Sequence, residues 1–94
     1  MEREKTEDLM KIGVAGSLES SDVLLTVKDS KGISISIKSI VYDFFKEQIE
    51  ETVRRTLSDM KIENISVEVE DKGALDYTIR ARLMTAIARM EEMG

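Results

Sequence analysis

The sequence predicts an α+β fold, a two-layer sandwich of one four-stranded sheet with two helices on one face, in the order β-β-β-α-β-α. Two patterns predict it: period-two alternation of apolar residues in four short segments, and three- and four-residue spacings in two longer ones. The 94 residues suit one modest core, and no proline-rich linker divides them. We expect residues 1–8 to be a disordered tail and residues 9–94 to be a single domain.

The first predicted strand runs from Met10 to Leu18. Larger apolar residues alternate in it with a lysine and two small residues: Met10, Ile12 and Val14 against Lys11, Gly13 and Ala15. A period of two is typical of a strand with one buried face. We expect the small residues to lie on its outer face.

Two further strands follow, at Val23–Val27 and at residues 33–38, where Ile33, Ile35 and Ile37 alternate with polar residues. The segment Asp29-Ser30-Lys31-Gly32 lies between them, and Gly32 can adopt a positive φ. The sequence therefore predicts a hairpin in which these two strands pair directly.

The helices are predicted from apolar residues at helical spacing. The first would begin near Ile40 and extend for about five turns, with this apolar stripe: Val41, Phe44, Phe45, Ile49, Val53, Leu57 and Met60. A fourth strand, alternating from Ile65 to Asp71, precedes the second helix. The inward stripe of that helix would be Leu75, Ile79, Leu83, Ala86, Ile87 and Met90. Arg80 and Arg82 fall on opposite flanks of this stripe, with Arg89 beside Arg82.

The composition excludes most kinds of site. The net charge is −5, which disfavours nucleic-acid and anionic-membrane partners. Histidine and cysteine are absent, so the usual zinc sites, Cys-His pairs and Ser-His-Asp triads are not available. Neighbouring carboxylates such as Glu70 and Asp71 point apart, and we expect no metal site and no catalytic residue. Without a signal peptide or an apolar stretch of about 20 residues, the predicted location is the cytoplasm.

Two features remain for binding or modification. The segment Glu19-Ser20-Ser21-Asp22 consists of turn-forming residues, and a serine hydroxyl on an exposed loop can also be a substrate for another enzyme. The second feature is the outer side of the last helix, which is unusually small and apolar: Ala74, Tyr77, Ala81, Met84 and Ala88. Alanine is a strong helix former, which is one explanation for its frequency on this side. The alternative is that this side is a docking surface for another subunit.

The stretches GSLESSDVLL (residues 16–25) and VEVEDKGALDYTIRARLMTAI (residues 67–87) resemble the citrate lyase acyl carrier protein, or γ subunit, family. In that family the first serine of a Gly-Thr-Leu-Glu-Ser-Ser-Asp sequence carries phosphoribosyl-dephospho-coenzyme A through a phosphodiester bond. The matching residue here is Ser20, and Ser17 replaces the threonine. The resemblance thus implies a cofactor bound covalently to Ser20.

The same resemblance implies a carrier subunit that is not itself an enzyme. Its arm would hold acetyl and citryl groups as thioesters while citrate is cleaved to oxaloacetate and acetate. The implied partners are the citrate lyase α subunit (acyl transferase) and β subunit (citryl lyase), a prosthetic-group transferase and an acetylating ligase. Two alternatives stay open: the related carrier subunit of malonate decarboxylase, and a plain protein-interaction domain whose serine turn is structural.

Overall fold

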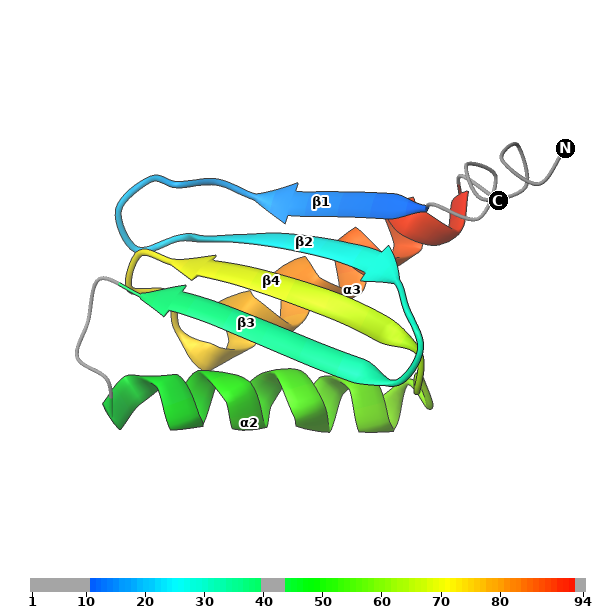
Figure 1. Ribbon diagram of the computed structural model, residues 1–94. Coiled ribbons are helices and arrows are strands. Elements are labelled where there is room, and N and C mark those ends of the chain that lie inside the picture. The colour runs from blue at the N-terminus through cyan, green and yellow to red at the C-terminus, as the bar shows by residue number, and fades with distance from the viewer. Residues whose placement is uncertain (1–10, 40–43, 93–94) are drawn as a thin grey trace, which may run out of the picture.

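The computed structural model describes residues 11–39 and 44–92 and has the predicted element order. Its elements are β1 (Ile12–Gly16), β2 (Val23–Asp29), β3 (Ile33–Ser39), α2 (Phe44–Asp59), β4 (Ile65–Asp71) and α3 (Asp76–Glu92). Both helices lie behind one four-stranded sheet (Figure 1), which confirms the α+β sandwich. The expected tail at residues 1–8, Met10 and the helix start near Ile40 lie outside the described residues.

The strand order is β1-β2-β4-β3, so the predicted direct pairing of β2 with β3 is wrong. β4 lies between them, antiparallel to β2 and parallel to β3 (Figure 1). The 29–32 segment therefore passes around the end of β4, where the Ile65 N–H donates to the Gly32 carbonyl at 3.0 Å. Asn64 Oδ1 accepts from the Gly32 N–H at 2.9 Å, and Gly32 has the expected positive φ of 75°.

The buried face of β1 is the reverse of the predicted one. Gly13 and Ala15 face the helices and are buried, whereas Ile12 and Val14 are 38 % and 42 % exposed. The cause is the close approach of α3, because a Cβ added at Gly13 would lie 1.9 Å from the Ala86 carbonyl oxygen. Only the small residues of the alternating pattern fit beneath the helix.

The core fills the space between the sheet and the two helices. Val53 and Leu57 of α2 are fully buried, and each contributes about 1.5–3 kcal/mol of apolar burial. The predicted stripe of α3 is confirmed from Ile79 to Met90, but Leu75 is 59 % exposed and precedes the helix. Leu75 fits the helical spacing of the stripe, but spacing alone does not show that the helix begins only after it, at Asp76.

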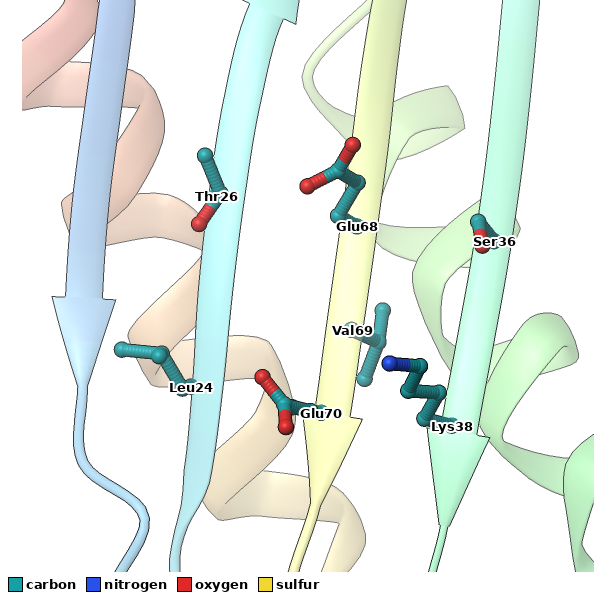
Figure 2. A pocket seen from close by; sticks show the side chains of 7 residues that line it. All are labelled: Leu24, Thr26, Ser36, Lys38, Glu68, Val69 and Glu70. Carbon is teal, nitrogen blue, oxygen red and sulfur yellow. The ribbon is translucent and has the colours of Figure 1, made fainter.

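The other face of the sheet carries polar side chains from three strands. Figure 2, seen from this side, shows Thr26 of β2, Glu68 and Glu70 of β4, and Ser36 and Lys38 of β3, with the helices behind the sheet. The register places Ser36 opposite Glu68 and Lys38 opposite Glu70. Polar residues at alternate positions keep this face compatible with solvent.

Arg80 and Arg89 lie on opposite flanks of α3, as predicted, and each contacts a different element. Arg80 forms an ion pair with Asp59 of α2 at 3.0 Å. On the other flank, Arg89 Nη1 donates to the Val14 carbonyl oxygen at 2.8 Å. This contact occupies a backbone acceptor of β1, which is an edge strand of the sheet.

Candidate functional site

The serine pair forms the tip of the turn between β1 and β2. The turn closes where the Asp22 N–H donates to the Glu19 carbonyl at 3.0 Å, which makes Ser20 and Ser21 its two central residues. Ser21 has a φ of 67°, as the second central residue of a type II turn requires. Ser20 is exposed, and its Oγ has no hydrogen-bond partner among the residues the structure describes.

Backbone hydrogen bonds fasten this turn to the sheet. The Ser17 N–H donates to the Val23 carbonyl at 3.1 Å across the base of the loop. The Ser21 N–H donates to the Lys72 carbonyl at 2.8 Å, and the Lys72 N–H returns a bond to the Asp22 carbonyl at 2.9 Å. The hydroxyl of Ser20 is therefore presented from a fixed backbone, next to the carboxyl end of β4.

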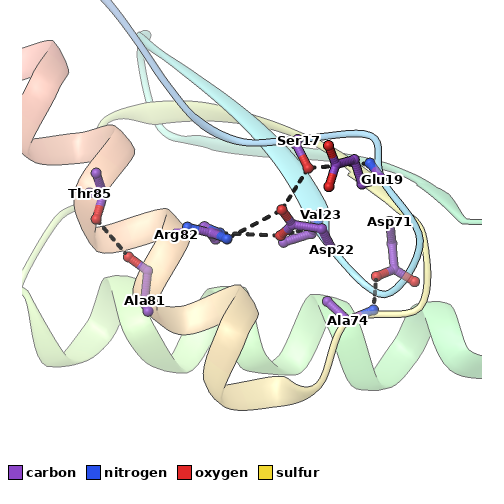
Figure 3. A network of polar contacts seen from close by, with 9 residues as sticks. All are labelled: Ser17, Glu19, Asp22, Val23, Asp71, Ala74, Ala81, Arg82 and Thr85. Carbon is purple, nitrogen blue, oxygen red and sulfur yellow. Dashed lines mark hydrogen bonds and ion pairs between the residues drawn. The ribbon is translucent and has the colours of Figure 1, made fainter.

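The Asp22 carboxylate connects the turn to α3 (Figure 3). Its Oδ2 accepts from Ser17 Oγ at 2.7 Å, and its Oδ1 accepts from the Val23 N–H at 2.7 Å. Arg82 of α3 donates to both oxygens through Nε and Nη2, each at 3.2 Å. The Asp22 side chain is only 17 % exposed, so this bidentate pair is partly shielded from solvent.

These contacts hold the pKa of Asp22 below its ordinary value. The largest cause is the Ser17 hydroxyl, followed by the Val23 N–H and Arg82, while burial acts in the opposite direction. Because the folded carboxyl has the lower pKa, its contribution to stability is complete above the unfolded pKa of about 3.9. That contribution is lost as the pH falls through the folded pKa.

We expect Asp22→Asn to lower the urea midpoint at pH 7, because the amide cannot replace the charged acceptor. The difference between the two proteins should narrow as the pH is lowered from about 5 to below 3, since the wild-type carboxyl then becomes protonated. Urea unfolding followed by circular dichroism at several pH values measures this difference. A difference that stays constant over the whole range would show that the Asp22 charge does not stabilise the fold.

Asp71 is a buried hydrogen-bond acceptor at the same end of the sheet. It is the last residue of β4, is buried, and accepts from the Ala74 N–H at Oδ1 and from Ser39 Oγ at Oδ2, both at 2.9 Å. Its neighbour Glu70 lies on the opposite face of the sheet, as predicted for this carboxylate pair. Asp71 thus fixes the connection from β4 to α3 beside the serine turn.

The sequence alone singles out Ser20 and Ser21 as candidates, whereas it does not indicate the residues that hold their turn. Arg82 was placed correctly on a helix flank, but its partner Asp22 is 60 positions away in the chain. The backbone of Lys72 is part of the site through hydrogen bonds that depend on the strand order. No local pattern indicates either contact.

The chain is similar to known carrier proteins over most of its length. A family model described as the malonate decarboxylase delta subunit (MdcD) matches residues 10–90. The citrate lyase acyl carrier protein of Fusobacterium nucleatum is 48 % identical over 86 residues, which cover 89 % of this chain and 92 % of the relative. The chain belongs to the citrate lyase acyl carrier protein family. The Streptococcus mutans protein of that name is 43 % identical over 88 residues, 92 % of this chain and 86 % of its own.

Solved structures share the fold of this carrier family at lower identity. A chain of a Pseudomonas malonate decarboxylase hetero-tetramer, crystallised with malonate, superposes with a TM-score of 0.69 at 22 % identity, covering 89 % of this chain and 84 % of that one. The Staphylococcus aureus RNase P protein gives 0.52 at 14 % identity, covering 82 % and 83 %. Such different proteins show that the fold alone does not determine function.

Membership of this family indicates a carrier subunit rather than a catalytic one, with a covalently attached prosthetic group. Within residues 11–39 and 44–92, no group of three metal-binding side chains comes together. The helices over the same ranges are too short or too polar to cross a membrane.

Proposed function

We propose that the chain is the acyl carrier subunit of citrate lyase and that Ser20 carries phosphoribosyl-dephospho-coenzyme A. The observation that supports this most directly is the position of Ser20: an exposed hydroxyl at the tip of a turn that is fastened on both sides. An incoming transferase needs such an accessible residue on a defined backbone. The match of Ser20 to the attachment serine of the family agrees with this position.

The residues around Ser20 fit a group that is attached by a partner. In the attachment step, an O–P bond forms at Ser20 Oγ and a phosphoanhydride bond of an activated, polyphosphate form of the group breaks. The hydroxyl proton passes to a base of the transferase, and the released polyphosphate departs with that bond's electrons. The chain contains no histidine or cysteine, and the Asp22 carboxylate already accepts from Ser17, Val23 and Arg82, so we assign to this chain only the placement of the hydroxyl.

When bound, the group supplies a thiol on which acetyl and citryl groups are held as thioesters. The α subunit would exchange acetyl for citrate, the β subunit would release oxaloacetate, and a ligase would acetylate the thiol initially. The carrier keeps the thioester at a high local concentration near each active site. The exposed side of α3, which includes Tyr77 and Met84, is available for docking these subunits.

The experiment that tests this proposal is an intact-mass measurement. Protein produced together with the prosthetic-group transferase and its activated donor should gain one adduct, and peptide mapping should place the adduct on Ser20. A known citrate lyase carrier, treated in parallel, shows that the transferase is active. An unchanged mass under those conditions, or an adduct on another residue, would overturn the proposal.

The carrier subunit of malonate decarboxylase is the second candidate, because the matching family model bears that description. The two candidates share the arm and differ in the enzymes that bind the carrier. Loaded protein should therefore be tested with the catalytic subunits of each enzyme. Citrate cleavage without malonate decarboxylation supports the first candidate, and the opposite result supports the second.

A further inference from the structure

We propose that a lysine-lined hollow beside the serine turn binds the phosphate groups of the prosthetic arm, an inference that rests on the proposed function. The hollow has a volume of about 370 Å³ and lies at the carboxyl ends of β3 and β4. Its cationic lining comes from three elements: Lys38 at the end of β3, Lys46 in the first turn of α2, and Lys72 just after β4. The contacts that hold the serine turn do not involve the side chains of these lysines, so they leave the role of the lysines open.

The hollow and the attachment residue belong to the same end of the molecule. The backbone of Lys72 forms two hydrogen bonds with the turn, one with Ser21 and one with Asp22. A group joined to Ser20 therefore starts next to a lysine that lines the hollow. The phosphodiester phosphate lies at Ser20 itself, and the diphosphate of the dephospho-coenzyme A part comes before its thiol-bearing portion. The charged part of the arm would therefore begin beside the hollow, ahead of the thiol.

The charges in the hollow favour an anion. Lys38 and Lys72 form no ion pair with any residue in the described part of the chain. Glu70 also lines the hollow and lies opposite Lys38 in the register, but Figure 2 shows its carboxylate on the β2 side of β4 and Lys38 on the β3 side. The remaining acid, Asp71, is buried and bonded to Ala74 and Ser39.

Weak binding is sufficient for this role. Lysine ammonium groups bind phosphate as point charges, and exposed pairs of this kind are screened by salt. A short tether gives an effective concentration in the millimolar range, so a site with a Kd of about 1 mM is substantially occupied by its own arm. The arm would then dock reversibly and would remain free to leave for an active site.

The first test uses protein with a bare Ser20 and inorganic pyrophosphate as the probe. Titration at low salt, followed by ¹H–¹⁵N spectra, should shift the amides of Ser39 and Lys72. The double variant Lys38→Gln/Lys72→Gln should weaken binding by about 3- to 30-fold. The matched control Lys28→Gln/Lys31→Gln removes two charges at the other end of the sheet and should bind as the wild type does. Equal affinity of the two double variants would overturn the inference.

The second test compares bare and loaded protein without added phosphate. Loading should shift the Ser39 amide in the wild type but not in Lys38→Gln/Lys72→Gln. The ³¹P resonances of the arm should differ between the two loaded proteins, while intact mass shows the adduct in both. A Ser39 shift that persists in this variant, or pyrophosphate binding with no loading-dependent shift at Ser39, would overturn arm docking. Absence of the adduct itself would instead contradict the proposed function, so the two failures are distinguishable.

Discussion

Citrate cleavage by a reconstituted lyase is expected to fall to the level of a mixture without carrier when Ser20 is replaced by alanine. The reason is chemical: Ser20→Ala removes the oxygen that the phosphodiester needs, and no thiol in the sequence can replace the arm. The hydroxyl has no hydrogen-bond partner among the described residues, so the fold should be unchanged. Cleavage is measured as oxaloacetate formation after incubation with the transferase and its donor, and circular dichroism checks the fold.

Ser21→Ala is the matched control for this experiment. It removes a neighbouring hydroxyl but keeps the backbone N–H that Ser21 donates to the Lys72 carbonyl. This variant should be loaded and should support cleavage. Activity that survives in Ser20→Ala and disappears in Ser21→Ala would move the attachment point to Ser21. Activity in both variants would exclude attachment at this turn.

Replacing Gly13 with alanine is expected to destabilise the fold by about 3 kcal/mol or more. The new Cβ would lie 1.9 Å from the Ala86 carbonyl oxygen and 2.7 Å from the Met90 nitrogen. Both are backbone atoms of α3, so the helix would have to move away from β1 by more than about 1 Å to restore ordinary contact. For a domain of this size the midpoint of thermal unfolding should fall by about 12–24 °C.

Gly32→Ala provides the contrast. Nothing lies within 4 Å of its added Cβ, so the cost there is limited to the positive φ of 75° and should be about 1 kcal/mol. Thermal unfolding of the two variants separates steric from backbone effects. A loss at Gly13 no larger than the loss at Gly32 would mean that α3 does not pack on β1 as closely as the structure has it.

The same closeness explains why part of the fold could be predicted and part could not. Alternation identified β1, but its period of two does not say which face is buried. Gly13 and Ala15 face inward because α3 leaves little space above β1, and α3 lies some 70 residues later in the chain. Local alternation also identified β2 and β3 correctly. Their separation by β4 follows from long-range pairing, for which the 29–32 turn contains no signal.

The candidate site divides in a similar way. The choice of Ser20 as the attachment residue remains a prediction. It can be made from the sequence because the residues that mark it are consecutive, and the exposed position of Ser20 is compatible with it. Arg82, Asp71 and Lys72 support the turn through contacts between segments that are distant in sequence. A helical spacing places Arg82 on a flank, but only the fold shows that Asp22 lies opposite. The candidate attachment residue is therefore indicated by a local stretch of sequence, whereas the contacts that hold its turn depend on the fold.

The hydrogen bonds from the serine turn to Val23 and Lys72 limit the region that a prosthetic arm on this turn could reach. If Ser20 carries the arm as proposed, both ends of the turn are bonded to the sheet, and the pivot of the arm stays at one point of the carrier during every visit to an enzyme. The volume that the thiol sweeps is then a sphere set by the length of the arm. Enzymes whose catalytic centres lie beyond that radius can be reached only if the whole carrier is displaced.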